Sequence, residues 1–95
     1  MKDFTEEELA YITRLAAAAF PPHQIAIVMR TDPVLFSEAA NETTSKVFEA
    51  VNAGFLTRQL ELRERIFLDA KNGSSPAQTI ASRLMDNFII KSILK

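Results

Sequence analysis

Four basic side chains lie near one another along a single stretch of the sequence, and their chemistry is that of phosphate recognition. They are Arg58, Arg63, Arg65 and Lys71. Residues 1–42 carry three basic and seven acidic side chains, a net charge of −4, whereas residues 43–95 carry eight basic and five acidic ones, a net charge of +3. Because cationic side chains bind nucleic acids by neutralising phosphates, we expect any phosphate-binding surface in the second part of the chain.

The other reactive side chains do not predict an enzyme. Glutamates 6–8 are consecutive, so on a helix they point in different directions and are better explained by capping than by catalysis or metal binding. The single histidine, His23, follows two prolines, and Tyr11 has the position of a packing residue. The sequence around Gly73 lacks the second glycine and the lysine of a phosphate-binding loop. We therefore expect no catalytic, metal-binding or cofactor-binding residues.

Length and composition predict one small helical protein. The chain has 95 residues, 47% of them hydrophobic, and no cysteine, which allows one core and excludes disulfides and thiol chemistry. Its first residues lack the pattern of a signal peptide, and no apolar stretch approaches the roughly 20 residues that span a bilayer. We expect a cytoplasmic location and no contact with membranes.

The positions of these side chains depend on the helices that carry them, and three helices are predicted in residues 1–42. The first, over residues 5–20, begins with capping-box spacing between Thr5 and Glu8. The second covers residues 22–29, and the third begins at Pro33 after the capping residue Asp32. Two short helices joined by a short turn predict a helix-turn-helix. Ile25, Val28 and Met29 are expected to face inward from the second helix, and the apolar residues of the third are Val34, Leu35, Phe36 and Ala39.

The third predicted helix has few side chains that read DNA bases. Only Asn41 belongs to the residue types that bind base edges well, and Glu38 and Glu42 would repel phosphate. Ser37 and Asn41 are four residues apart and could share a polar face. Sequence-specific reading by this helix is therefore not expected.

Two long helices joined by a tight turn are predicted for residues 43–95. The first runs from residue 44 or 45 to Lys71, and Gly73 suits the left-handed residue that ends a helix. Ser74 or Ser75 then caps a helix that begins near Pro76. The result is an all-α protein with an N-terminal helix-turn-helix unit, residues 1–42, and a helical hairpin, residues 43–95.

Both hairpin helices carry more apolar side chains than a single packing face can bury. One stripe on the first helix contains Phe48, Val51, Phe55, Leu62 and Ile66, and a second contains Leu56, Leu60 and Phe67. On the last helix the packing stripe is Ala77, Ile80, Ala81, Leu84, Met85 and Phe88, and beyond it Ile89, Ile90, Ile93 and Leu94 spread around the helix. The excess surface must meet either the N-terminal helices or a neighbouring subunit. We expect oligomer or partner contacts at Leu56, Leu60, Phe67, Phe88, Ile89, Ile90, Ile93 and Leu94.

The order of elements resembles the small subunit of the phage terminase, the factor that recognises viral DNA for the large packaging subunit. The resemblance lies in residues 20–26 leading to Asp32-Pro33, in residues 54–63, and in residues 70–77, where a long helix ending in Ala-Lys-Asn-Gly turns into the next. It implies a DNA-engaging helix-turn-helix and a hairpin that assembles subunits into a ring. It also implies duplex DNA and the large terminase subunit, or another phage protein, as partners in the host cytoplasm.

This chain departs from that pattern because its helix-turn-helix is acidic. DNA contacts would then use Arg30, Lys46 and the basic side chains of the long helix, with Ser37 and Asn41 as the polar candidates on the third helix. One alternative is a helical adaptor or virion protein that binds other proteins and no DNA. A second alternative, a transcriptional regulator, is disfavoured by the charge of the third helix.

Overall fold

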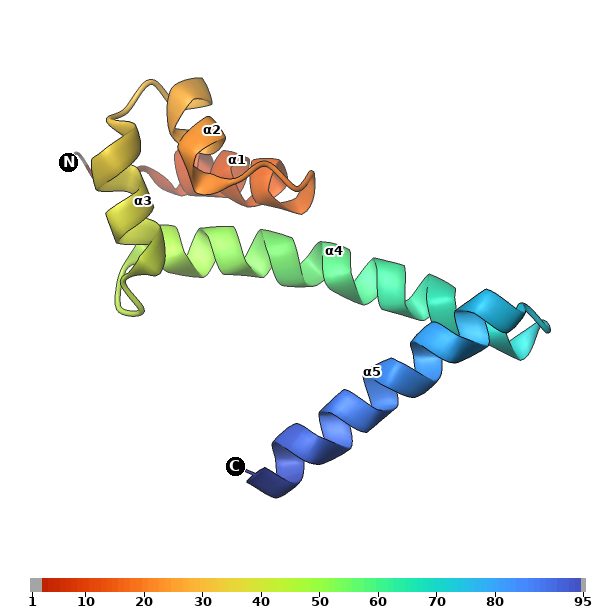
Figure 1. The fold of residues 1–95 in the computed structure, drawn as a ribbon. Helices are drawn as coiled ribbons and strands as arrows, with labels where there is room; N and C mark the ends of the chain where they lie inside the picture. The colour runs from red at the N-terminus through yellow and green to blue at the C-terminus, as the bar shows by residue number, and fades with distance from the viewer. Residues whose placement is uncertain (1–2, 95) are drawn as a thin grey trace. The chain divides into compact units, whose positions relative to one another are not determined.

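The computed structural model describes residues 3–94, with side chains for residues 3–89 and for Lys91, and these residues form α-helices without any strand (Figure 1). The helices are α1 (Glu6–Ala17), α2 (Pro22–Val28), α3 (Pro33–Asn41), α4 (Lys46–Lys71) and α5 (Ser75–Leu94). The predicted all-α class is confirmed. In the described part of the chain, no helix is both long and apolar enough to cross a membrane.

The beginnings of α1 and α3 follow the predicted caps. Thr5 accepts a hydrogen bond from the backbone N–H of Glu8 at 3.1 Å, and the Glu8 carboxylate accepts one from the backbone N–H of Thr5 at 2.9 Å. Asp32 accepts bonds from the N–H groups of Val34 and Leu35 at 2.8 and 3.1 Å. These side chains satisfy backbone donors that have no partner within the helix, which fixes where each helix begins.

Helices α1, α2 and α4 end in the same left-handed turn. The second residue after each helix has a positive φ: 69° at Ala19, 56° at Arg30 and 98° at Gly73. Behind α1, for example, the N–H of Ala19 donates to the carbonyl of Ala16 at 2.9 Å and the N–H of Phe20 to that of Leu15 at 3.2 Å. The same pair of bonds occurs behind α2 and α4, and it is the Schellman pattern. Helix α1 consequently ends at Ala17, before the expected end at residue 20.

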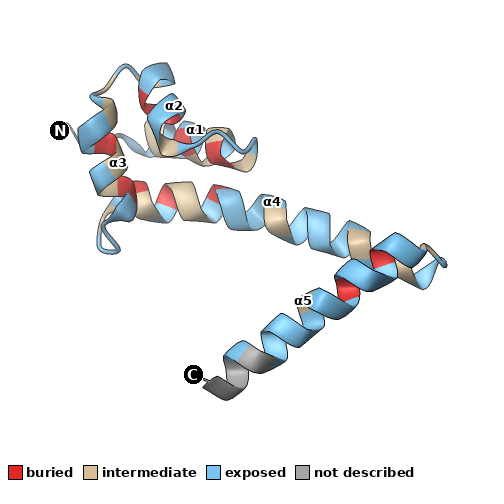
Figure 2. Ribbon diagram, in the orientation of Figure 1, coloured by how far each residue is buried: buried red, intermediate tan, exposed pale blue. Residues whose placement is uncertain are grey.

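The chain divides into two compact units, Met1–Gln59 and Leu60–Lys95, so the division falls within α4. The first unit contains α1, α2, α3 and the first part of α4. Its core is formed by side chains from all four helices, with Ile12, Ile25 and Phe36 fully buried (Figure 2). Phe4 packs edge-on against the Phe36 ring, with 6.0 Å between ring centroids.

Helix α4 packs in the first unit through its small residues. Its buried residues there are Val47, Ala50 and Gly54, whereas Phe55, which was expected on the packing stripe, is exposed. Gly54 lies directly against α1, because a Cβ atom added to it would come within 2.9 Å of the Cβ atom of Ala16. Small side chains allow two helix backbones to approach closely, and the helix therefore turns this face inward.

One inward-facing prediction for α2 also requires correction. Val28 was expected to face inward but is exposed, and the apolar residues Val34 and Leu35 of α3 are exposed as well, Val34 by 66%. They lie at the end of α2 and the beginning of α3, where each helix buries one narrow face centred on Ile25 or Phe36. The remaining apolar side chains of these short helices stay on the surface.

The second unit contains the rest of α4, the turn at Gly73, and α5. Among its described residues, the buried ones are Ala77 and Ala81. The Ser74 hydroxyl accepts a bond from the N–H of Ala77 at 3.3 Å, and the Gln78 amide donates to the carbonyl of Ala70 at 3.1 Å. Four side chains expected on packing stripes of this unit are exposed: Leu62, Ile80, Met85 and Phe88.

Candidate functional site

The candidate DNA-binding residues are divided between the two units. Arg30, Ser37, Asn41, Lys46 and Arg58 belong to the first unit, and Arg63, Arg65 and Lys71 to the second. Within the first unit, the structure brings Ser37 and Asn41 together on α3. Arg30 lies on the α2–α3 turn and Lys46 is the first residue of α4. Each of these groups is described within its own unit below.

Helices α2 and α3 form an acidic and partly apolar groove. It has a volume of about 580 Å³ and is lined by His23, Asp32, Pro33, Val34, Ser37, Glu38 and Asn41. The Asn41 amide donates to the carbonyl of Ser37 at 3.1 Å, one turn earlier in the same helix. Asp32 and Glu38 give the groove two carboxylates, and no lysine or arginine is among the described residues that line it. This surface is therefore unsuited to phosphate, which is the electrostatic result expected from the sequence.

Arg58 has a partner at the end of α1. Its Nε atom donates a hydrogen bond to the carbonyl oxygen of Ala17 at 2.7 Å. Ala17 is the last residue of α1, and the last carbonyls of a helix lack partners within the helix and carry partial negative charge. Arg58 thereby ties α4 to the end of α1, a structural role that the sequence pattern did not indicate.

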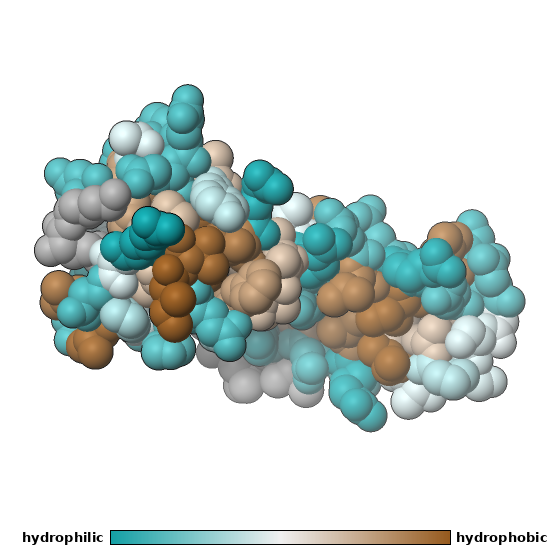
Figure 3. Space-filling model, turned by 90° about the horizontal axis from the view of Figure 1, so that it is seen from above, coloured by the Kyte–Doolittle hydropathy of each residue, from teal (hydrophilic) through white to brown (hydrophobic). Residues whose placement is uncertain are grey.

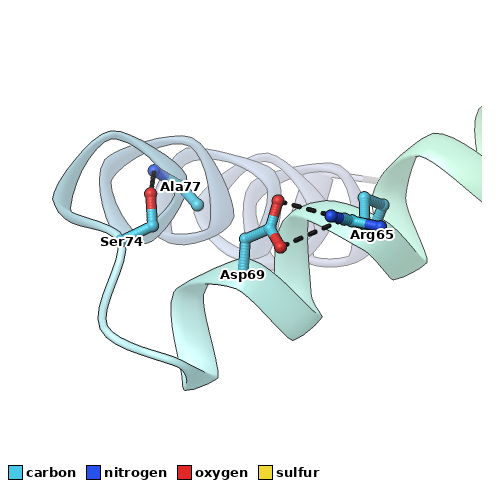
Figure 4. Close-up of polar contacts among 4 residues, drawn as sticks. All are labelled: Arg65, Asp69, Ser74 and Ala77. Carbon is cyan, nitrogen blue, oxygen red and sulfur yellow. Dashed lines mark hydrogen bonds and ion pairs between the residues drawn. The ribbon is translucent and has the colours of Figure 1, made fainter.

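Arg65 is paired with a carboxylate on its own helix. Its Nε atom lies 3.1 Å from one carboxylate oxygen of Asp69 and 3.3 Å from the other (Figure 4). Both side chains are largely exposed, so the pair adds on the order of 0–1 kcal/mol to stability. The neighbouring negative charge does, however, partly cancel the attraction of Arg65 for phosphate.

Arg63 and Lys71 share one exposed face of α4 with two of the candidate assembly residues. Leu60, Arg63, Phe67 and Lys71 are spaced by three and four residues, which places them along one side of a helix. All four are exposed, Leu60 by 58% and Phe67 by 41%. We name this set the α4 stripe. Cationic and large apolar side chains thus alternate along a single surface that the sequence analysis had treated as two separate sites.

The remaining candidate assembly residues are also exposed where they are described. Leu56 lies on α4 in the first unit, and Phe88 and Ile89 lie on α5, with Phe88 exposed by 67%. The side chains of Ile90, Ile93 and Leu94 lie outside the described residues. Apolar side chains gather at the surface of the second unit among polar ones, as the right-hand part of Figure 3 shows.

No cluster of three metal-ligating side chains occurs among the residues that the structure describes. The first unit also has an apolar pocket of about 330 Å³ beside the end of α1, lined mainly by Phe20, Pro22, Val51 and Phe55. Among its described lining residues, the polar side chain is the neutral amide of Asn52.

Comparison of the chain with protein-family models, with curated proteins and with solved structures finds no match.

Proposed function

We propose that this chain is a non-catalytic assembly subunit of the small-terminase type, which acts as a homo-oligomer in the recognition and packaging of viral DNA. The observation that carries the proposal is the composition of the second unit. Most of its described large apolar side chains are exposed, Ile66 and Leu84 are half-buried, and the buried residues among those described are two alanines. Such a unit requires a second surface to cover it.

The size of the second unit supports this reasoning. Units below about 40 residues rarely bury enough apolar surface to be stable alone and commonly need disulfides, metals or association. The chain has no cysteine, and its described residues contain no metal-ligating cluster. Contact with another surface, for which we propose a second copy of the chain, is a further way for this unit to gain stability from burial.

The DNA-binding part of the proposal rests on the α2–α3 pair and on the resemblance to small terminase subunits. The two helices are joined by a short turn, as a helix-turn-helix requires, and this turn carries Arg30. Because the groove between them is acidic, we assign DNA contact to exposed cations outside it, Arg30 and Lys46 on the first unit. Multiple copies in one assembly would multiply weak contacts with phosphate.

Two measurements on the full chain test the proposal. Native mass spectrometry should give an oligomer, and fluorescence anisotropy with labelled duplex DNA should show binding that weakens as salt rises. Arg30→Glu/Lys46→Glu should reduce DNA affinity, whereas Arg14→Glu, a control cation that stacks on Tyr11, should reduce it less. A strict monomer, or no salt-sensitive DNA binding at micromolar protein, contradicts the proposal.

A second candidate function is that of a helical adaptor or virion protein without DNA binding. The acidic and apolar lining of the α2–α3 groove favours it, because Val34 and Glu38 suit contact with a protein better than contact with phosphate. Pull-down experiments with a large packaging subunit and with virion proteins, alongside the DNA titration, separate the two functions. Protein binding combined with absent DNA binding selects the adaptor.

A further inference from the structure

We infer that the α4 stripe of one copy docks in the α2–α3 groove of the next copy, so that the chain assembles head to tail. The inference rests on the proposed homo-oligomer and specifies the two surfaces that meet. The stripe consists of Leu60, Arg63, Phe67 and Lys71, and the groove presents Asp32, Glu38 and Val34.

The stripe has the chemistry of a protein-binding surface. Protein–DNA interfaces are more polar and far more positively charged than protein–protein interfaces. Here Leu60 and Phe67 alternate with the two cations, and phosphate would leave both apolar side chains without a suitable contact. An acidic surface that also carries apolar side chains offers a suitable contact to all four side chains of the stripe.

The α2–α3 groove is such a surface, and every copy of the chain carries one. Two carboxylates line it, Val34 is exposed by 66%, and the described lining residues include His23 but no lysine or arginine. Charge complementarity extends to the units that carry the two surfaces. Residues 1–59 contain five basic and eight acidic side chains, a net charge of −3, whereas residues 60–95 contain six and four, a net charge of +2.

The dimensions of the two surfaces also agree. At a rise of 1.5 Å per residue, the stripe from Leu60 to Lys71 extends over about 16 Å, and α3 extends over about 12 Å. A helix laid in the groove between two others is a common mode of recognition. Cations of the stripe can then meet the groove carboxylates while Leu60 and Phe67 cover Val34.

This contact joins two different surfaces and is therefore heterologous. Each copy keeps one stripe and one groove available, so association continues until a ring closes or a filament grows. An isologous dimer in which two second units pair with each other would instead leave the groove uncovered. The proposed contact thus predicts that charges on α3 control assembly through α4.

A charge swap in the full chain tests the contact. Arg63→Glu and Glu38→Lys should each weaken association roughly tenfold or more, because each places like charges across the interface. The combined variant should recover most of the lost affinity, measured by analytical ultracentrifugation at low salt. Arg83→Glu, on α5 of the same unit, carries the same charge change as Arg63→Glu and serves as the control. Combining it with Glu38→Lys should not recover the affinity that Glu38→Lys loses. Circular dichroism should show the same helix content in all of these variants, since all three sites are exposed.

The outcomes separate this inference from the proposed function. Two results overturn the docking mode alone. In the first, both single variants leave the oligomer intact. In the second, Arg63→Glu weakens association and Glu38→Lys does not restore it. Loss of DNA binding by Arg63→Glu without loss of association assigns the stripe to DNA, which also overturns it while the proposed function stands. A wild-type chain that remains monomeric overturns both.

Discussion

Gly54 on α4 approaches Ala16 on α1 so closely that a Cβ atom on Gly54 would lie 2.9 Å from the Cβ atom of Ala16 and 3.0 Å from the backbone nitrogen of Ala17. The same Cβ atom would lie closer still to the carbonyl oxygen of Thr13. Two of these three contacts involve backbone, which cannot move aside as a flexible side chain can. The absence of a side chain at Gly54 therefore sets the spacing of the two helices.

Gly54→Ala should lower the free energy of unfolding by about 1–3 kcal/mol, the usual cost of overpacking. Helix propensity alone predicts the opposite sign, since alanine is more favourable than glycine in a helix interior by about 1 kcal/mol. Urea unfolding followed by circular dichroism decides between them. Ala53→Gly, one residue earlier at an exposed position, should lose only the propensity difference. A stabilised Gly54→Ala variant would show that α1 and α4 do not approach each other as closely as described.

Ala19→Gly should stabilise the protein by about 0.5–1 kcal/mol. Ala19 has a φ of 69°, and a left-handed conformation costs an L-residue roughly 1–2 kcal/mol, part of which is offset by the greater freedom of glycine in the unfolded chain. The matched control is Ala18→Gly, because Ala18 has a φ of −86° and gains nothing from glycine. Thermal unfolding should rank the variants in the order Ala19→Gly, wild type, Ala18→Gly. Equal stability of the two variants would contradict the prediction.

The helix ends show which features of the fold can be read from the sequence. Thr5 and Asp32 cap helices through their own side chains, and Gly73 is the residue type that a left-handed turn favours, so all three positions were predicted. Ala19 and Arg30 form the same turn but belong to residue types that carry no such preference. The hydrogen bonds that close these turns use backbone atoms alone, and the sequence gives no sign of them.

Burial along α4 shows why the packing face was predicted incorrectly. Hydrophobic periodicity gives weight to large side chains such as Phe55, whereas the helix buries Val47, Ala50 and Gly54. Close approach of two helices depends on small residues, to which hydrophobic periodicity gives little weight. The second stripe, Leu56, Leu60 and Phe67, was expected to meet either the N-terminal helices or a neighbouring subunit, and all three side chains are exposed in the structure.

Arg58→Lys should separate the structural role of this residue from a role in DNA binding. Lysine keeps the positive charge but loses the Nε hydrogen bond to the Ala17 carbonyl, so the free energy of unfolding should fall by about 0.5–1.5 kcal/mol. DNA affinity at fixed salt should stay unchanged, since a phosphate contact needs mainly the charge. Arg63→Lys, at an exposed position on the same helix, is the control and should leave stability unchanged. Unchanged stability of Arg58→Lys would contradict the structural role.

Phe88→Ser should weaken self-association while changing the stability of the separate chain by no more than about 0.5 kcal/mol. The Phe88 side chain is 67% exposed, so the isolated chain loses little burial, whereas an assembly that covers it loses the transfer of a large aromatic group from water. Sedimentation measured over a range of protein concentrations should show the shift toward smaller species. Asn87→Ser, the exposed neighbour, is the control and should associate like the wild type.

The two measurements on Phe88→Ser distinguish an assembly contact from a packing contact within one chain. A large loss of stability at concentrations where only the single chain is present would mean that Phe88 packs within its own chain. Unchanged association would mean that the oligomer covers the α4 stripe and leaves the end of α5 for a different protein. In that case the charge swap between Arg63 and Glu38 should still control assembly, because its two sites lie on other helices than Phe88.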